Sequence, residues 1–203
     1  MRGSSRTCAA LKRLLAATAA TLLLSLPPAW AEGDAARGKA KAEQCFGCHG
    51  ETGNSTIPNT PSLAGQPAAY TFLQLFLFRE KLRNVPTMTP FVEGKSDDDL
   101  NDLAAYFAAQ KLEPDPEPRD TARYRRGAEL SQRLRCASCH GAGYLGQAQM
   151  ARLAGQREDY TLMSLEQYQK NERTGIDTNM AAVIYGLPAA DLAALAHYMA
   201  HQK

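Results

Sequence analysis

The chain contains the pattern C-x-x-C-H twice, as Cys45-Phe46-Gly47-Cys48-His49 and as Cys136-Ala137-Ser138-Cys139-His140. This pattern is typical of c-type haem attachment, because two thiols three positions apart can form thioethers to the two vinyl groups of one porphyrin. The histidine that follows then lies beneath the iron, where an imidazole is a suitable proximal ligand. The sequence therefore predicts two covalently attached haem c groups, held by Cys45, Cys48, Cys136 and Cys139, with His49 and His140 as iron ligands.

A C-x-x-C pair can also form a dithiol redox centre or contribute to a zinc site. A thioredoxin-like dithiol needs a βαβ context, and strand-forming residues are scarce, since Val and Ile together number six against 34 Ala and 24 Leu. A zinc site needs four ligands, whereas each half of the chain offers three adjacent ones. Covalent haem is the favoured interpretation, and the composition predicts an all-α fold.

The two motifs belong to an internal repeat that covers the chain after its first 31 residues. Leu63-Ala64-Gly65-Gln66 recurs as Leu153-Ala154-Gly155-Gln156, and the segment that ends at Tyr106 recurs in related form before Tyr198. Between the copies, residues 112–120 contain three alternating prolines, which predict a stiff, extended linker. We expect one domain over residues 32–111 and a second over 121–203, each so small that a central haem contributes much of its stability.

Each half is expected to contain three main helices. They cover about 34–45, 67–83 and 96–110 in the first half, and about 122–135, 157–171 and 189–201 in the second. Ser96 followed by three aspartates is a capping sequence that places carboxylates at the positive end of a helix. Gly38 and Gly127 fall inside helices, where glycine costs about 1 kcal/mol relative to alanine. A close crossing against Tyr106 and Tyr198 would explain them, and a late helix start is the other possibility.

Residues 1–31 have the features of a secretory signal peptide. Four Lys and Arg side chains precede the uncharged run Leu14 to Leu26, and Ala29-Trp30-Ala31 provides a cleavage site after Ala31. The 13-residue run is too short to span a bilayer. Removal of this segment takes four positive charges and no carboxylate, so the formal net charge falls from +2 to −2. The sequence predicts an exported, mildly acidic protein with at most peripheral membrane association and no nucleic-acid partner.

The sixth iron ligand separates electron transfer from catalysis, because an iron with two protein ligands has no position for a substrate. Methionine is the expected partner of histidine in a c-type electron carrier. Met88 lies 43 residues after Cys45 and Met180 lies 44 after Cys136, each in an expected loop between the second and third helices. The duplication therefore favours Met88 and Met180 as ligands. The other mature methionines fall on core helical positions or too near a haem histidine (Met150, Met163, Met199).

Charged side chains and histidines outside the haem motifs are expected to have structural roles. The aspartate run at residues 97–99 and the stretch Arg123-Tyr124-Arg125-Arg126 are expected to cap helices and to face solvent, with haem propionates or an acidic partner as the less favoured reading of the arginines. His197 and His201 are expected to be exposed, because Ala105 occupies the position of His197 in the first copy.

Two class I cytochrome c domains in tandem, each with Leu-Ala-Gly-Gln-x-x-x-Tyr after its haem motif, closely resemble the dihaem cytochrome c4 family. The resemblance covers the whole chain after the signal peptide. It implies that His49 and Met88 ligate one haem, and that His140 and Met180 ligate the other. It also implies that the Pro61 carbonyl accepts a hydrogen bond from the proximal imidazole; Ala151 holds that position in the second half, where a carbonyl is still available.

The resemblance further implies a periplasmic carrier of single electrons, with a quinol-oxidising complex as donor and a terminal oxidase as acceptor. A second possibility is the electron-accepting subunit of a periplasmic dehydrogenase, such as a sulfide-oxidising flavocytochrome. A dihaem peroxidase would need one five-coordinate iron, and the duplicated methionines argue against it. No acid–base dyad, nucleophile or phosphate loop accompanies the haem motifs, so we expect that the protein is not an enzyme and has no catalytic residues.

The two copies differ most on the second helix of each half. Phe76 and Leu77 occupy the positions of Glu166 and Gln167. If both halves share one fold, these apolar side chains face outward, and a helix that is apolar all round must be buried somewhere. We expect a contact surface between the halves or for a partner; a slightly larger first core is the alternative.

Overall fold

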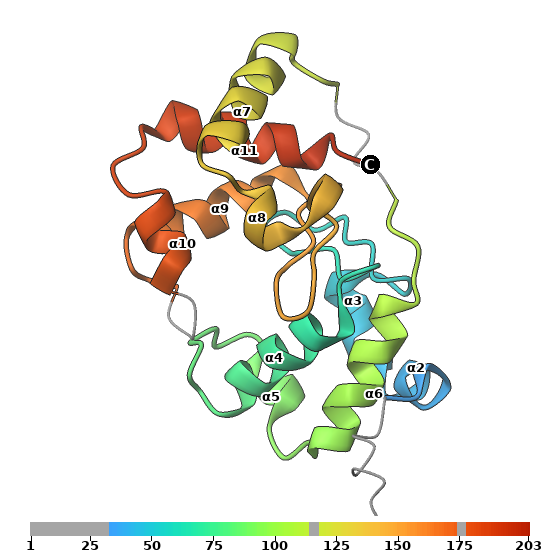
Figure 1. Cartoon of the computed structure of the whole chain (residues 1–203). Coiled ribbons are helices and arrows are strands. Elements are labelled where there is room, and N and C mark those ends of the chain that lie inside the picture. Colours follow the sequence, from blue (N-terminus) through green and yellow to red (C-terminus); the bar gives the residue numbers. More distant parts are fainter. Residues whose placement is uncertain (1–32, 114–117, 174–177) are drawn as a thin grey trace, which may run out of the picture. The chain divides into compact units, whose positions relative to one another are not determined.

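The computed structural model describes residues 33–113, 118–173 and 178–203, and over these residues it contains helices and no strands (Figure 1). The predicted signal peptide, its predicted cleavage site and the centre of the proline-rich linker lie outside the described residues. The first half contains α2 (Ala35–Ala42), η1 (Glu43–Cys45), α3 (Phe46–His49), α4 (Ala68–Arg79), α5 (Thr89–Val92) and α6 (Asp97–Ala108). The second half contains α7 (Thr121–Arg133), α8 (Ala137–His140), η2 (Ala142–Tyr144), α9 (Glu158–Gln169), α10 (Thr178–Val183) and α11 (Ala189–Ala200).

The three main helices of each half lie where the sequence predicts them, with shorter ends. Ser96 caps α6 as expected, because its hydroxyl accepts a hydrogen bond from the Asp99 amide and the Asp99 carboxylate accepts one from the Ser96 amide. The one-turn helices α3, α5 and α8, the two-turn α10 and the short η2 were not predicted. They are too short to show a 3.6-residue apolar period.

Two glycines set the helix crossings, as predicted. In each half the first and last main helices cross, α2 with α6 and α7 with α11 (Figure 1). A Cβ atom added to Gly38 would lie 2.0 Å from the Asp102 carbonyl oxygen, and one added to Gly127 would lie 2.1 Å from the Ala194 carbonyl oxygen. The Cβ atoms of Tyr106 and Tyr198 are the side-chain contacts at these crossings. The close crossing therefore explains both glycines, and a late helix start does not.

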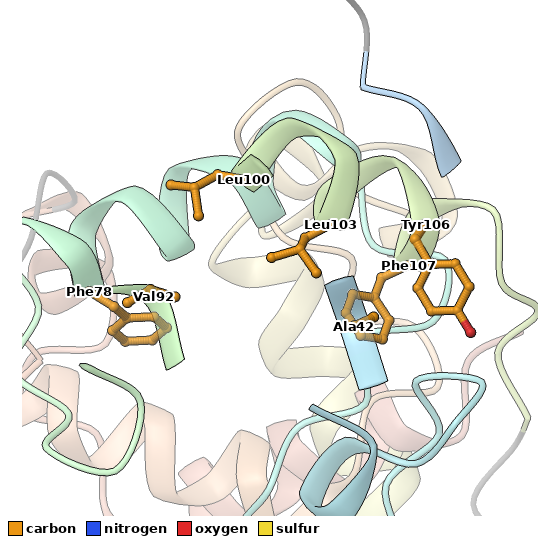
Figure 2. Close-up of a cluster of buried hydrophobic side chains, with 7 residues drawn as sticks. All are labelled: Ala42, Phe78, Val92, Leu100, Leu103, Tyr106 and Phe107. Atoms are coloured by element: carbon orange, nitrogen blue, oxygen red, sulfur yellow. The ribbon is translucent and has the colours of Figure 1, made fainter. Parts of the chain in front are cut away.

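Apolar side chains cluster in the interior of each half. In the first half Leu100 and Leu103 extend from α6 toward the interior, with Phe78 and Val92 at one end and Ala42 and Phe107 at the other (Figure 2). In the second half the corresponding cluster includes Leu130 of α7, Leu165 of α9 and several residues of α11. Leu77 is 3% exposed, and the half-buried Phe76 packs against the first cluster, which favours the larger first core over the predicted contact surface.

Ion pairs fasten the first helix of each half. Asp102, 1% exposed, accepts hydrogen bonds from Arg37 and Lys41 at 2.7–2.9 Å. Arg126 holds Asp191 through two contacts of 2.8 and 2.9 Å, and Arg123 contacts Glu158. Arg123 and Arg126 are exposed, as expected, and they also bind carboxylates of their own half.

His197 is 2% exposed, so the prediction that it faces solvent is wrong. Its Nε2 accepts a hydrogen bond from the Asp120 amide at 2.9 Å, and its Nδ1 therefore carries the proton that it shares with Glu158 at 2.6 Å. The position of Glu158 is alanine in the first half, as is that of His197 (Ala68 and Ala105). The second half thus buries a polar group where the first half has methyl groups.

Gly33–Lys203 form one compact unit, and two matched glutamines join its halves. Gln66 donates to the Arg152 carbonyl at 2.9 Å and accepts from the Arg152 amide at 3.0 Å. Gln156 donates to the Ser62 carbonyl at 2.8 Å and accepts from the Ser62 amide at 2.9 Å. Each glutamine thus satisfies one backbone donor and one backbone acceptor of the opposite half.

Candidate haem centres

The histidine of each C-x-x-C-H motif ends a one-turn helix and is buried. His49 is 5% exposed and His140 is 8% exposed. Glycine follows each of them with φ of +77° and +79°, a conformation that lets the chain turn away from the helix without strain. The loop beyond then returns over the imidazole, held by a hydrogen bond of 2.7 Å from the Leu63 amide to the Gly53 carbonyl.

A backbone carbonyl orients each of these imidazoles. Nδ1 of His49 lies 2.9 Å from the Pro61 carbonyl oxygen, and Nδ1 of His140 lies 2.9 Å from the Ala151 carbonyl oxygen. Because a carbonyl can only accept, Nδ1 is the protonated nitrogen of each ring and Nε2 carries the lone pair. Both predicted hydrogen bonds are confirmed. Their length is the same whether the acceptor belongs to a proline, Pro61, or to an alanine, Ala151. Burial lowers the pKa of His49, more than the bond to Pro61 raises it, and so favours the neutral ring that can bind a metal.

Each motif presents two cysteines, one half-buried and one exposed. Cys45 immediately precedes α3 and Cys48 lies three residues later, so one helical turn brings both to neighbouring positions. Cys136 immediately precedes α8 and Cys139 lies within it in the same way. Burial raises the pKa of Cys45 to about 11 and also raises that of Cys136. A reactive dithiol requires a lowered thiol pKa, so the structure disfavours that reading.

The zinc reading is also disfavoured by the arrangement of possible ligands. Within the described ranges, the group of His, Cys, Asp and Glu side chains close enough to share an ion consists of Glu158, His197 and His201. Neither C-x-x-C-H motif contributes to that group. Among the described residues, the thiols and imidazoles of the motifs therefore do not form a cluster that could share one metal ion.

The two methionines favoured by the sequence each pack against an apolar cluster of their own half. Met88 is the residue before α5 and packs against the same apolar cluster as Cys45. Met180 packs against the apolar cluster of the second half. Met180 lies inside α10, although a loop was expected there. Met199 is 3% exposed on α11, which confirms the core role expected for it.

Two arginines with matched surroundings were not singled out from the sequence. Arg83 stacks on the ring of Phe78, with its guanidinium carbon 4.7 Å from the ring centre, and Arg173 stacks on Tyr168 at 4.8 Å. Their numbers differ by 90, the offset of the Leu-Ala-Gly-Gln repeat. That spacing is the signal that could have found them.

The apolar interior of the first half fits a haem, because Cys45 and Met88 pack against the same cluster and the buried, oriented His49 belongs to the same motif as Cys45. In the second half Met180 packs against one apolar cluster and Cys136 against another, and His140 is buried and oriented in the same way as His49. None of the described helices is long and apolar enough to cross a membrane.

Comparison with known proteins extends to both halves. The family model for cytochrome c matches residues 35–111 and again residues 124–203. Cytochrome c4 of Pseudomonas aeruginosa is 36% identical over 180 residues, which cover 84% of this chain and 90% of that protein. A protein of Stutzerimonas stutzeri named thiosulfate dehydrogenase electron acceptor is 31% identical over 201 residues, which cover 90% of this chain and 91% of that protein.

A solved structure agrees with these sequence matches. The crystal structure of reduced recombinant cytochrome c4 from Pseudomonas stutzeri matches with a TM-score of 0.78 and 33% identity, and covers 84% of this chain and 100% of that one. The similarity thus accounts for the whole repeat and not for one motif. The chain belongs to the cytochrome c4 family of dihaem electron-transfer cytochromes and carries two covalently attached haem c groups.

Proposed function

We propose that each haem is held by the thiols and axial side chains of its own half. Cys45 and Cys48 form the thioethers of the first haem, with His49 and Met88 on its iron. Cys139 and Cys136 form those of the second, with His140 and Met180 on its iron. The domains are then 32–111 and 121–203, joined by the linker 112–120. The observation that carries the proposal is the matched pair of imidazoles, each fixed at 2.9 Å by a carbonyl that leaves Nε2 as the ligand atom.

Each haem supplies an iron that stores one electron. The chain's own residues set the reduction potential of each haem. Donation from Nδ1 to the Pro61 and Ala151 carbonyls fixes ring orientation and makes Nε2 a stronger ligand. The apolar clusters exclude water from both sites, and a methionine ligand favours a high reduction potential. With both axial positions taken by side chains, no position remains for a substrate. The protein is then a carrier of single electrons and not an enzyme.

A test of the ligand assignment uses single methionine variants. Met88→Leu and Met180→Leu should each remove half of the near-infrared methionine–iron absorption and convert one haem from its low-spin state. Met163→Leu is a matched control, because the first half has Leu73 at that position. It should leave the spectrum unchanged. An intact absorption band in either ligand variant contradicts the assignment.

The setting that we propose is the periplasm. Residues 1–31 act as a signal peptide removed after Ala31, and the mature protein carries electrons from a quinol-oxidising complex toward a terminal oxidase. N-terminal sequencing of protein from a native host checks the cleavage. A mature protein that begins well before Glu32 contradicts it.

A second function is favoured by one specific similarity. The relative named thiosulfate dehydrogenase electron acceptor matches nearly the full length of this chain. On that reading the protein accepts electrons from a periplasmic dehydrogenase. Purification from the native host separates the two functions: a free shuttle is isolated alone, and a dedicated acceptor is isolated with its dehydrogenase or is reduced by it in a defined mixture.

A further inference from the structure

The half-buried cysteines of the two haem motifs have different neighbours, although the halves share one fold. Cys45 packs against the apolar cluster of the first half, which contains Phe107. Cys136 packs against a smaller cluster, in which Tyr144 and Met199 are buried. Each of these sulfur atoms is a proposed attachment point of a haem. A difference in their surroundings therefore lies at the covalent edge of one haem and not of the other.

Tyr144 occupies the position that Gly53 has in the first half. The amides of Leu153-Ala154 donate to the Tyr144 carbonyl at 2.8 and 3.1 Å, and those of Leu63-Ala64 donate to the Gly53 carbonyl at 2.7 and 3.1 Å. The backbone is left-handed at both positions, with φ of +75° at Gly53 and +59° at Tyr144. Glycine adopts this conformation freely, whereas a bulky residue is strained in it. An aromatic side chain held there needs a contact that compensates for the strain.

The space for the Tyr144 ring comes from a second difference between the halves. A Cβ atom added to Gly53 would lie 2.9 Å from the Phe107 ring, so the first half has no room for a side chain there. Met199 holds the position of Phe107, at the offset of 92 that also relates Leu103 to Leu195. The two differences are complementary in volume: the first half has its aromatic ring on the helix, and the second half has it on the loop.

The Tyr144 ring carries an oxygen that Phe107 lacks, and this oxygen has a buried partner. The Tyr144 and Ser131 hydroxyl oxygens lie 2.6 Å apart, and the two residues are 8% and 1% exposed. Ser131 corresponds to Ala42, since each lies four residues after the glycine of its helix crossing. We call Ser131 and Tyr144 the hydroxyl pair. The first half has a methyl group and a glycine at these two positions.

The hydroxyl pair has one hydrogen left to donate, because only one of its two hydrogens is needed for the bond within the pair. The Cys136 sulfur is placed to accept it. The Cys136 amide donates to the Ser131 carbonyl at 3.1 Å, so the two residues lie next to each other at the end of α7. Burial raises the pKa of the Cys136 thiol, and the hydrogen bond from the Ser131 side chain opposes that rise. The donors therefore run from Tyr144 through Ser131 toward the sulfur, and a thioether sulfur remains a weak acceptor.

On the basis of the proposed attachment of the second haem to Cys136, we propose that Ser131 and Tyr144 are positioning residues that raise the reduction potential of that haem through its thioether. A hydroxyl that donates toward the sulfur turns the positive end of its dipole to the haem edge. The reduced state is then favoured, because its iron has one positive charge fewer, and hydrogen bonds near a haem are a known means of setting its potential. Ala42 and Gly53 provide no such dipole to the first haem.

The decisive variant is Ser131→Ala, which gives the second half the residue of the first. It should lower the potential of the second haem, so that at a fixed ambient potential the ratio of reduced to oxidised haem falls about threefold, or roughly 30 mV at 59 mV per tenfold for one electron. Tyr144→Phe should lower it by less, since Tyr144 acts through Ser131. The double variant should fall no further than Ser131→Ala. The first haem is an internal reference whose potential should not change.

Tyr124→Phe is the matched control. Tyr124 contacts the ring of Tyr198 at 5.0 Å between ring centres, and its hydroxyl accepts a hydrogen bond from Gln202 at 3.1 Å. This variant also removes one phenol oxygen from the second half, and it should leave both potentials unchanged. Redox titration gives the two potentials, and the step that moves in Met180→Leu belongs to the second haem. If Ser131→Ala fails to incorporate its haem, Tyr144→Phe, which removes a single oxygen, still supplies the test.

The possible outcomes separate a redox role from a structural one. Variants that are less stable but shift the second haem no more than Tyr124→Phe show that the hydroxyl pair serves packing alone, and they overturn the proposal. Equal shifts of both haems overturn it too, because the effect is then not carried by Cys136. A double variant whose shift is the sum of the single shifts overturns the relay through Ser131. Peptide mapping of the unmodified protein tests the attachment itself: a second haem not bound to Cys136 would contradict the proposed function instead.

Discussion

The crossing of α7 and α11 gives the sharpest test of the packing. In Gly127→Ala the new methyl carbon would lie 2.1 Å from the Ala194 carbonyl oxygen and 2.5 Å from the Tyr198 Cβ atom. The nearest contact is backbone, so no side chain can rotate away to relieve it. The two helices must separate by roughly 1 Å, because methyl–oxygen contacts in packed interiors are about 3.5 Å and only part of the misfit can be absorbed elsewhere.

Two effects of opposite sign determine the size of the change. Overpacking costs about 1–3 kcal/mol, and more where the backbone cannot yield. Alanine in a helix is favoured over glycine by about 1 kcal/mol. Since the clash is with a backbone carbonyl, we expect the cost of overpacking to exceed the gain in helix propensity. The net loss in the free energy of unfolding is then about 2 kcal/mol. For cooperative unfolding of a unit of this size, that loss lowers the Tm by about 4–8 °C.

Thermal unfolding of the holoprotein, followed by circular dichroism, measures this change. Gly47→Ala is the matched control, because it also lies in a helix, has no positive φ and has no neighbour within 4 Å of an added Cβ. It should leave the Tm unchanged or raise it slightly. If Gly127→Ala is as stable as the control, the glycine does not set the crossing and the packing argument is refuted.

Two further perturbations test contacts of Gln156 and Asp102. Gln156→Leu leaves the Ser62 amide and carbonyl buried without partners, so urea unfolding should show a loss of about 2–4 kcal/mol, and no loss would contradict the bridging role. The hydrogen bond from Arg37 outweighs burial and, with Lys41, lowers the pKa of Asp102 below its unfolded value. Its stabilisation is therefore complete above the unfolded pKa of about 3.9 and is lost as the pH falls toward the folded pKa, so Asp102→Asn should flatten the acid limb of the stability curve.

The parts of the structure that the sequence predicts are those with a strong local signal. The helices around Leu100 and Leu195 have long apolar patterns, and Ser96 has its cap. The crossing at Gly127 was predictable because a glycine inside a helix is costly unless something approaches it. The carbonyl partner of His140 followed from the resemblance, and it survives without proline because any residue supplies a carbonyl.

The parts that were missed depend on contacts distant in sequence. His197 was expected in solvent because its counterpart is alanine, yet Glu158 and the Asp120 amide, 39 and 77 residues away, satisfy it in the interior. Phe76 was assigned to a surface because its counterpart is Glu166. In both cases the inference assumed that corresponding positions of the two copies have the same environment. The two halves pack differently, so this assumption fails at these positions.

Reciprocity across the halves is the feature that repeat analysis alone could not assign. A residue that occurs in both copies can make contacts within its own half or with the other half. The sequence around Gln66 and Gln156 does not distinguish these two possibilities. The structure shows that they act between them, each on the backbone of the opposite half. Such an interface is self-complementary, like that of a symmetric dimer, so a change at one position can be balanced only by contacts of the other copy. That mutual dependence explains why the glutamines recur in both halves while positions such as His197 have diverged.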